Sequence, residues 1–342
     1  MSGRPAELDM LRPEAENKVE RKRMPDRPRA MLATLTHDYF SSPDWIYERK
    51  LDGERCLVVA RSGRVTLRSR SGQDTTSTWP EIAEALETLE DRGFVADGEI
   101  VAFEGRVTSF SRLQQRIGLT DPDKARASGV RVYLYLFDLL FLEGYDLREV
   151  PLRARKKILK NALKFDDPVR FTAHRNRDGE AYYREACRKG WEGVIAKRAD
   201  SPYRARRSRD WLKFKCSKGQ ELVIGGFTEP SGERVGLGAI FVGYYDDDKF
   251  CYAGKVGTGF DDDTLRTLRE RLEELERDRP AFEAVPGSVG DGAHWVEPRL
   301  VAEIAFTEWT RAGRLRHPRF QGLRRDKKAR DVVRERPKPV SP

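Results

Sequence analysis

Cysteine is scarce in this sequence, and its few copies lie far apart. Four occur among 342 residues, at Cys56, Cys187, Cys216 and Cys251, and no two of them form a CxxC pair. We therefore expect neither a structural zinc site nor a framework of disulfide bonds, and a reducing compartment fits this usage. The four histidines likewise show no metal-ligand spacing.

Long apolar runs are also missing. No stretch approaches the roughly 18 uninterrupted apolar residues that a membrane span needs. The first 30 residues contain no apolar segment of the kind found in secretory signals. These absences exclude a membrane-spanning protein and a small secreted domain, and we expect a cytoplasmic protein.

Charge is abundant. Charged residues make up 35% of the chain and hydrophobic residues 38%, with a net charge of +9. Residues 311–336 hold eleven Lys/Arg against three Asp/Glu, and residues 199–219 hold seven against two. Each block alone fits a solvated face, but two such blocks favour nucleic acid or nucleotide phosphate as the partner.

The length predicts two domains, at roughly 150 residues per domain. Residues 1–30 and 331–342 are polar and rich in charge, so we expect two tails. Residues 31–218 mix strand-like and helical patterns, whereas 219–330 are mostly strand-like. The expected fold class is α+β, with antiparallel sheets and flanking helices in the first domain.

Strand-like runs in the first domain are separated by turn signals. Runs at 46–49, 56–60 and 65–68 are β-branched or apolar, with an Asp-Gly turn at Asp52–Gly53. The stretch FVADGEIVAF is interpreted as a pair of strands that turn at Asp97–Gly98.

The second domain has four or five expected strands and one helix. The helix is indicated by leucines at helical spacing, Leu265, Leu268, Leu272 and Leu275. Such a set in about 110 residues predicts a small closed barrel of the OB type.

A short motif places three reactive groups around one turn. In Lys50-Leu51-Asp52-Gly53-Glu54-Arg55, an amine, a carboxylate and a guanidinium are close in sequence. Alone, this fits a hairpin with a solvated lysine equally well. Further blocks follow in order: Ser69-Arg70-Ser71-Gly72, Asp97-Gly98-Glu99, Phe137-Asp138-Leu139, Glu192 to Lys197, Trp211 to Lys215, and Arg324-Arg325-Asp326-Lys327.

Together these seven blocks resemble the nucleotidyltransferase motifs of ATP-dependent DNA ligases, which RNA ligases and mRNA capping enzymes share more loosely. The resemblance extends from about residue 30 to residue 330. It implies an ATP-grasp-like adenylation domain followed by an OB-fold barrel. It also implies ATP and a divalent metal, Mg or Mn, as cofactors.

The resemblance makes Lys50 the nucleophile that takes AMP from ATP. A lysine attacks phosphorus only as a neutral amine, and neighbouring cations disfavour its protonated form. Lys213 and Lys215 are two apart on an expected strand and therefore point to one side. If that side faces Lys50, they assist it and neutralise the α-phosphate; a solvated edge strand with two lysines is the alternative.

Other roles follow from the resemblance alone. Glu192 supports the metal, and Glu99 contacts the ribose or a metal-bound water. Asp52, beside the nucleophile, helps in metal binding. Phe137 stacks on adenine, although its apolar surroundings fit a core residue as well, and Glu48 lies near the base.

Arginines and one further lysine complete the expected site. Arg55 and Arg70 match arginines that contact phosphate or nicked DNA, and Arg207 matches one that grips the 5′-phosphate of the nick. Arg324 and Lys327 belong to a block that clamps the departing pyrophosphate.

Residues 303–327 narrow the resemblance to the ligase modules of bacterial end-joining systems, the ligase D and ligase C types. The expected substrate is nicked or broken duplex DNA, bound by a monomer. This sequence shows no polymerase or nuclease domain, so we expect a recruiting partner, for which the family suggests the end-binding protein Ku.

Two alternatives stay open at this point. One is an RNA ligase or a GTP-dependent capping-type enzyme. The other is a non-catalytic nucleic-acid-binding module, which would not need Lys50, Glu192 and the terminal basic block together.

Overall fold

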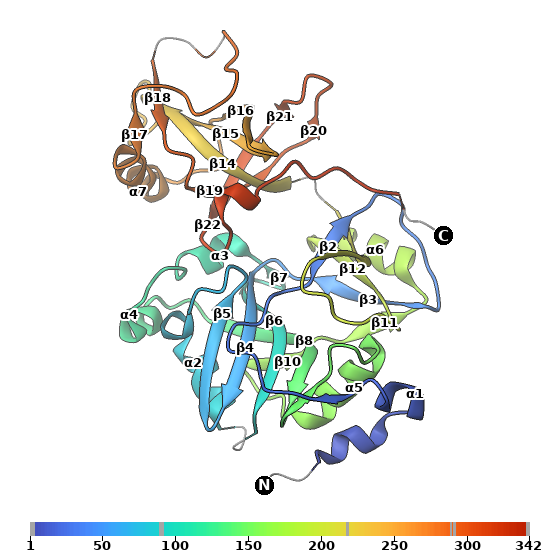
Figure 1. Ribbon diagram of the computed structural model, residues 1–342. Helices are drawn as coiled ribbons and strands as arrows, with labels where there is room; N and C mark the ends of the chain where they lie inside the picture. Colours follow the sequence, from blue (N-terminus) through green and yellow to red (C-terminus); the bar gives the residue numbers. More distant parts are fainter. Residues whose placement is uncertain (1–3, 89–91, 217–218, 288, 290–291, 340–342) are drawn as a thin grey trace. The chain divides into compact units, whose positions relative to one another are not determined.

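The structure is a computed structural model, and it describes residues 4–88, 92–216, 219–287, 289 and 292–339 (Figure 1). The chain divides into two compact units, Met1–Cys216 with Pro337–Pro342 and Ser217–Arg336. We call them the first and the second unit and describe each by itself.

A large sheet in the first unit runs in the order β1-β9-β8-β6-β4-β5, with β10 on β8 and β7 on β6. Every pair is antiparallel except β10 with β8. Its strands are β1 (Glu20–Arg21), β4 (Glu54–Arg61), β5 (Arg64–Ser69), β6 (Phe94–Glu104), β7 (Val107–Thr108), β8 (Val132–Leu142), β9 (Tyr145–Asp146) and β10 (Val169–Phe171).

Alternation along β4 shows how this sheet buries both faces. Val58 and its alternate neighbours pack into one core, which includes residues of α2 (Pro80–Glu87), α3 (Phe110–Gln114) and α5 (Leu152–Ala162). Leu57 and Val59 point the other way, into a second core that contains Trp211. The outer face is therefore covered by helices, and the inner face turns toward the next sheet.

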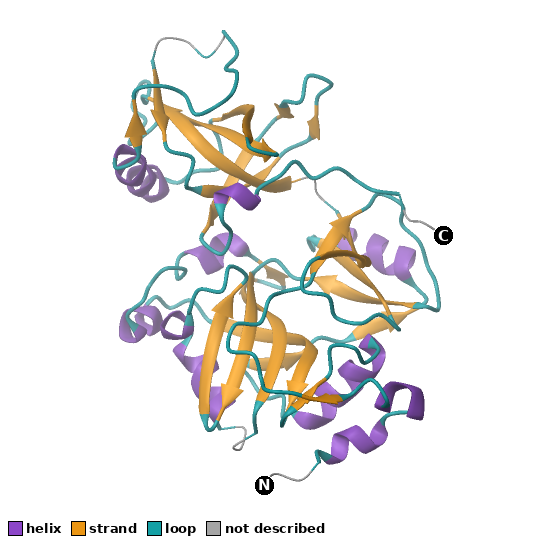
Figure 2. Cartoon of the chain, viewed as in Figure 1, coloured by secondary structure: helices purple, strands orange, loops and turns teal. Residues whose placement is uncertain are grey.

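The smaller sheet runs in the order β11-β3-β12-β13-β2 (Figure 2). Its strands are β2 (Leu32–Leu35), β3 (Trp45–Lys50), β11 (His174–Asn176), β12 (Gly193–Arg198) and β13 (Arg207–Lys215). Tyr47, Val194 and Phe214 pack in one core with Tyr182 and Ala186 of α6 (Gly179–Arg188). Since side chains alternate along a strand, the residues between them occupy the opposite face.

In the second unit one seven-stranded sheet replaces the expected barrel. It runs β16-β15-β14-β18-β17, and β19 joins β14 to β22. Its elements are β14 (Gly219–Thr228), β15 (Ala239–Asp246), β16 (Lys249–Val256), α7 (Asp262–Glu273), β17 (Glu276–Arg277), β18 (Ala293–Val296), β19 (Val301–Ala305) and β22 (Arg319–Arg324).

The predicted strands and helix of this unit are present, but their hydrogen bonds close no ring among the described residues. The register of β14 against β15 shifts between Ile224 and Gly226. The first half of β14 pairs with β19 and its second half with β18. Such an irregularity bends a strand, so that one strand serves two partners on the same edge. The prediction of a closed barrel is therefore wrong for this structure.

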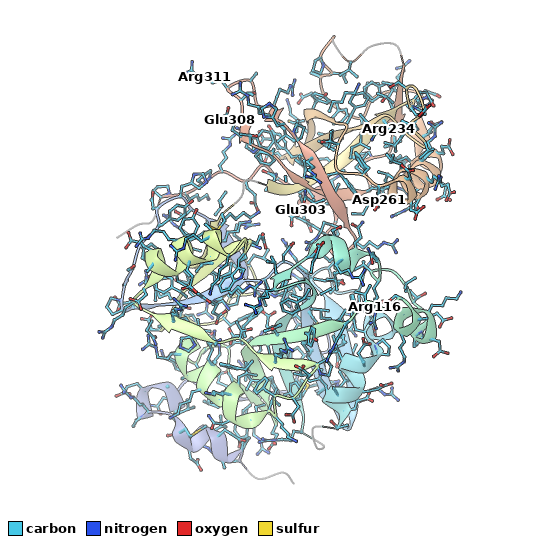
Figure 3. All side chains as sticks on the ribbon, turned by 180° about the vertical axis from the view of Figure 1, so that it is seen from behind. Arg116, Arg234, Asp261, Glu303, Glu308 and Arg311 are labelled. Atoms are coloured by element: carbon cyan, nitrogen blue, oxygen red, sulfur yellow. A yellow bond between two sulfur atoms is a disulfide. The ribbon has the colours of Figure 1, made fainter. Side chains whose placement is uncertain are left out.

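Local side-chain contacts support α7 and, separately, a two-stranded hairpin. Asp261 accepts a hydrogen bond from the amide of Thr264 at 2.8 Å, which caps the helix N-terminus (Figure 3). The hairpin of β20 (Glu308–Trp309) and β21 (Leu315–Arg316) carries a 2.7 Å ion pair between Glu308 and Arg316.

Two Asp-Gly turns were predicted, and neither makes a hairpin. Asp97 and Gly98 lie in the middle of the single strand β6, which is paired on both sides by β4 and β8. The Asp52–Gly53 connection links β3 to β4, which belong to different sheets. The dipeptide signals a hairpin only when the flanking strands pair with each other.

The N-terminal segment is not the predicted tail. It forms a 3-10 helix at Ala6–Met10, α1 at Pro13–Glu16 and β1, which pairs with β9. Leu8 is fully buried in the helix-covered core of the first unit, and Glu7 pairs with Arg92 at 2.7 Å. Leu8 and Ala15, with Leu11 and Val19 packed against the same core, dock the segment.

The C-terminal segment also departs from the prediction of a tail. Val332 is fully buried in the core of the second unit. Further along, the amide of Lys338 donates a hydrogen bond to the carbonyl of Leu35 in the first unit.

The cysteines give a further correction. Cys187, in α6, and Cys216, directly after β13, form a disulfide with Cα atoms 5.2 Å apart. The fold brings together two residues that are 29 apart in sequence. No spacing rule could have paired them. Among the described residues, none of the helices combines the length and apolar character that crossing a membrane requires.

We predict that Leu8→Ala destabilises the first unit by about 2 to 3 kcal/mol, because it leaves a cavity in a closed core. Tryptophan fluorescence during urea unfolding reports this loss, since Trp79 lies in the same core. The exposed neighbour Lys18, changed to Ala, serves as the control. Equal unfolding midpoints for all three proteins would show that the segment does not pack.

Candidate functional site

Charged side chains gather on the inner face of the smaller sheet. Lys50 lies opposite Gly193 across β3 and β12, and Gly193 lies opposite Lys215 across β12 and β13. The next two rows along the same strands are Glu48–Ile195–Lys213 and Ile46–Lys197–Trp211. Residues directly opposite one another share a face. The prediction that Lys213 and Lys215 point to the side of Lys50 is confirmed.

The backbone requires a glycine at position 193, which lies between Lys50 and Lys215 across the three strands. Gly193 has φ +148°, and a Cβ there would lie 1.9 Å from the carbonyl oxygen of Phe214. Gly53 has a similar constraint, because a Cβ would lie 2.1 Å from the carbonyl oxygen of Ile100.

Lys50 has a close acidic partner. Its Nζ donates to Oε2 of Glu192 at 2.5 Å, and each side chain is about one-fifth exposed. Burial alone would raise the pKa of Glu192, but the cations Lys50, Lys215 and Lys213 lower it overall. Glu192 is therefore ionised, and its carboxylate accepts a hydrogen bond from the nitrogen of Lys50.

Asp52 anchors the connection after Lys50. Its Oδ2 accepts a hydrogen bond from the amide of Phe110 at 3.1 Å, and its own amide donates to Oγ1 of Thr108 at 3.1 Å. These contacts tie the end of β3 to β7 and α3. The position beside Lys50 agrees with the sequence, and the metal role stays a prediction.

Arg55 is clamped in the wall formed by the large sheet. Its Nε and Nη2 donate to the two oxygens of Asp97 at 2.5 and 2.7 Å, and Tyr203 donates to the same carboxylate at 2.5 Å. Burial would lower the pKa of Arg55, but Asp97 raises it overall. Glu99 lies opposite Arg55 on β6. Sequence reasoning assigned no role to Asp97 or Tyr203.

Phe137 lies where the two sheets meet. Its ring is 7% exposed, with Lys197 Nζ 4.1 Å and Arg55 Cζ 4.8 Å from its centroid, and it stands edge-on to Trp211. The side chain is thus a core residue that borders the charged face. Adenine stacking by this ring stays a prediction.

Glu48 is the most enclosed carboxylate of this face. Its Oε1 lies 2.5 Å from Nζ of Lys156 and its Oε2 lies 2.6 Å from Nζ of Lys197, all three side chains being at most 2% exposed. Burial would raise the pKa of Glu48, but the two lysines lower it overall. Burial lowers the pKa of Lys197 to about 8.

Neither lysine was assigned a role from sequence. Lys156 lies among buried positions of α5, next to the equally buried Arg155 and the exposed Lys157, and charged residues at apolar positions of the helix were the available signal. Lys197 ends the block that begins at Glu192, but only Glu192 received a role.

Arg70 and Arg207 lie at other places in the first unit. Arg70 follows the end of β5, in a turn. Arg207 is exposed and begins β13, eight residues before Lys215, so the two are separated by roughly 25 Å along the strand. The structure therefore does not gather Arg207 with Lys50.

Arg324 and Lys327 belong to the second unit. Arg324 donates to both oxygens of Asp326 at 2.9 and 2.8 Å. Lys327 Nζ lies 3.0 Å from Glu221. Both cations are mostly buried and have acidic partners within their own unit.

The described residues contain no group of three or more His, Cys, Asp and Glu side chains arranged to hold a metal ion. Glu192, Glu99 and Asp52 offer the carboxylate oxygens that Mg²⁺ prefers. One or two of them suffice when nucleotide phosphates and water supply the other ligands, so these residues fit a metal that arrives with its nucleotide.

Stability of the first unit should depend on the ionised Glu48. A carboxyl group whose pKa is lowered by folding adds stability above its unfolded pKa and loses it as the pH falls, about 1.4 kcal/mol per unit of pKa difference. We predict that Glu48→Gln loses less stability than the unchanged protein between pH 7 and pH 4, measured by urea unfolding. An equal loss of stability in Glu48→Gln and in the unchanged protein would contradict an ionised Glu48.

Comparisons with known proteins place this site in a family. A family model described as "ATP dependent DNA ligase domain" matches residues 30–215, and another described as "ATP dependent DNA ligase C terminal region" matches residues 233–327. The first match includes every residue of the charged face.

Relatives with curated descriptions agree. The multifunctional non-homologous end joining protein LigD of Pseudomonas aeruginosa is 41% identical over 302 residues, which cover 86% of this chain and 35% of the relative. The protein of the same description from Mycobacterium bovis is 39% identical over 313 residues, with 89% and 39% covered. The chain thus spans less than two-fifths of these relatives.

A solved structure agrees as well. Mycobacterial DNA ligase D complexed with ATP and MES matches with a TM-score of 0.65 and 37% identity, covering 90% of this chain and 98% of that one. Both family models, the relatives and the solved structure of the mycobacterial ligase lead to the same assignment. The chain belongs to the ATP-dependent DNA ligase family.

Proposed function

We propose that this chain is the catalytic core of a DNA ligase that seals breaks in duplex DNA through a lysyl-AMP intermediate on Lys50. The observation that carries the proposal is the shared face of β3, β12 and β13, where Lys50, Glu192, Lys213 and Lys215 converge. An inert binding module would not need a lysine held 2.5 Å from a carboxylate amid further cations.

In the first step, Lys50 Nζ forms a bond to the α-phosphorus of ATP while the bond to the pyrophosphate oxygen breaks. The attacking nitrogen loses a proton, and the carboxylate of Glu192 at 2.5 Å is placed to take it. Lys213 and Lys215 stabilise the negative charge on the phosphoryl oxygens. A divalent metal, Mg or Mn, supplies further charge neutralisation at the phosphates.

The later steps use the same face. AMP passes from Lys50 to the 5′-phosphate of the break, which restores the amine. The 3′-hydroxyl then attacks that phosphate, and AMP departs as the leaving group. Glu192 and the two lysines remain beside the reacting phosphates throughout.

Nucleotide recognition is proposed for the wall beside the nucleophile. Glu48 and Phe137 bind the base, Glu99 the ribose or a metal-bound water, and Asp52 assists the metal. Arg55 lies beside Phe137 in this wall and contacts the nucleotide phosphates in the proposal.

DNA binding is proposed for Arg70 and Arg207 together with the basic block at residues 311–336 of the second unit. The distance of Arg207 from Lys50 suits a contact with the DNA backbone away from the reacting atoms. Since Lys and Arg displace counterions from phosphates, binding should weaken steeply with salt.

The physiological setting proposed for this chain is based on relatives that are described as end-joining proteins. We propose that this core acts as a monomer in the bacterial cytoplasm and nucleoid, in end-joining repair, with Ku as a recruiting partner. The alternatives are an RNA ligase and a GTP-dependent capping-type enzyme. Sealing assays with nicked DNA, nicked RNA and GTP in parallel separate them, and turnover only on RNA or with GTP would overturn the proposal.

Lys50→Ala should abolish AMP labelling of the protein and nick sealing from ATP, because no other amine occupies that position. The variant should still seal a nick that already carries AMP. Lys160→Ala, an exposed lysine on α5, is the control. Persistent labelling of Lys50→Ala would refute the assignment of the nucleophile.

Arg324→Ala and Lys327→Ala should slow lysine adenylylation at least about tenfold more than sealing of a pre-adenylylated nick, if these residues hold the departing pyrophosphate. The exposed neighbour Lys328, changed to Ala, should leave both steps nearly unchanged. Single-turnover rates of the two steps test this. Equal loss in both would indicate a general folding or DNA-binding role.

A further inference from the structure

We propose that Tyr203 is a positioning residue for the adenylylation of Lys50. Its hydroxyl group, the backbone of Met31 and the carboxylate of Asp97 together hold the guanidinium group of Arg55 in one orientation, with two N–H groups left for the nucleotide phosphates. The inference rests on the proposed function and deepens it, because it gives a role in the reaction to a tyrosine that touches neither the lysine nor a phosphate.

Four residues form a closed circuit of hydrogen bonds in the interior of the first unit, which we call the Arg55 circuit. Nε and Nη2 of Arg55 donate to the two oxygens of Asp97 at 2.5 and 2.7 Å, and Nη2 also donates to the carbonyl oxygen of Met31 at 3.1 Å. The amide of Met31 donates to the hydroxyl oxygen of Tyr203 at 2.8 Å, and that hydroxyl donates to Asp97 at 2.5 Å. Met31, Asp97 and Tyr203 are each at most 2% exposed, so little water competes for these bonds.

The hydroxyl group of Tyr203 works as acceptor and donor at once, which a phenyl ring cannot do. The carbonyl oxygen of Arg29 lies farther away, at 3.5 Å, so the hydroxyl proton belongs to Asp97. Burial and the negative charge of Asp97 raise the pKa of Tyr203 well above its ordinary value, so the proton stays on the tyrosine. Without the hydroxyl, the amide of Met31 would be buried with no acceptor, which is costly.

The Arg55 circuit occupies three of the five N–H donors of the guanidinium group. Aromatic rings limit its plane, since Cζ of Arg55 lies 4.8 Å from the centroid of Phe137 and 5.7 Å from that of Trp211. Nη1 has no hydrogen-bond partner among the described residues, and the side chain is 16% exposed. The two N–H groups of Nη1 are therefore the part of Arg55 that meets a ligand, and a guanidinium group suits phosphate oxygens.

The backbone around Tyr203 is anchored without the help of Arg55. Tyr203 lies in the connection between β12 and β13, and its amide donates to the carbonyl oxygen of Arg148 at 2.7 Å. In the same connection, the carbonyl oxygen of Arg206 accepts from the amide of Leu32 at 3.0 Å. The ring of Tyr203 also stands edge-on to Trp211, with centroids 5.9 Å apart. Tyr203→Phe should therefore keep the connection in place and remove only the hydroxyl group.

The test is a double-mutant cycle on adenylylation in the full chain, with ATP labelled at the α-phosphate. Single-turnover rates over a range of ATP concentrations are compared for the unchanged protein, Tyr203→Phe, Arg55→Lys, the double variant and the control Tyr47→Phe. Tyr47 is a matched control because its buried hydroxyl also accepts from a backbone amide, that of Ser42 at 2.9 Å. It packs in the core under α6, on the opposite face of the smaller sheet from the charged side chains.

We expect Tyr203→Phe to lower the maximal rate at least about tenfold, and to change the ATP concentration for half-maximal rate less than about threefold. Arg55→Lys keeps the charge but not the planar fork, and it should lower the maximal rate by at least about the same factor. Adding Tyr203→Phe to Arg55→Lys should cost less than about twofold more, because the group that Tyr203 positions is already gone. Tyr47→Phe should stay within about twofold of the unchanged protein.

A second variant covers the case in which Tyr203→Phe does not fold, as judged by a lost cooperative urea transition. Asp97→Asn keeps the shape of the side chain and the hydroxyl of Tyr203, but an amide nitrogen replaces one oxygen that Arg55 needs as an acceptor. The maximal rate should again fall at least about tenfold, and the fall should again nearly disappear when Arg55→Lys is already present.

An unchanged maximal rate in a folded Tyr203→Phe protein would overturn the inference while the proposed function stands. An equal fall in Tyr47→Phe would do the same, because it would show that any lost buried hydroxyl slows the reaction. Factors that multiply in the double variant would also overturn it, since Tyr203 would then act independently of Arg55. Absence of any AMP labelling in the unchanged protein would instead refute the proposed function.

Discussion

The ion pair between Lys50 and Glu192 is the interaction on which the proposed chemistry depends. A nucleophilic amine must lose a proton, and the proposal gives this proton to Glu192, a carboxylate within hydrogen-bond distance that nearby cations keep ionised. Lys213 and Lys215 are among these cations. In the proposal they also stabilise the negative charge on the phosphoryl oxygens, so the same two lysines assist both the proton transfer and the phosphate.

The two sheets of the first unit contribute different residues to this arrangement. On the smaller sheet, alternation sends Tyr47, Val194 and Phe214 under α6 and turns the charged residues the other way. On the large sheet, the face toward them carries Arg55 and Phe137, held by buried hydrogen bonds and ring contacts. Strands therefore position Lys50, Lys213 and Lys215, and Glu192 directly precedes β12.

The sequence predicted much of this and missed specific parts for physical reasons. Strand period was enough to place Lys213 and Lys215 on one side of a strand, but whether that side faces Lys50 needed the strand order of the sheet. Strand period and motif order were not enough to show that Asp97 lies inside a strand, because an Asp-Gly pair reads as a turn until its neighbours are known. Leu8 was missed because the segment around it is mostly polar and charged. The disulfide and the bend of β14 arise from contacts distant in sequence, and spacing alone does not encode these.

The most direct test of the account is peptide mapping by mass spectrometry after incubation of the full chain with ATP and Mg²⁺ or Mn²⁺. The account predicts the mass of one AMP on the peptide that contains Lys50, lost again when a nicked duplex is added. An adduct on Lys213 or Lys215 instead, or no adduct with either ion, would contradict it.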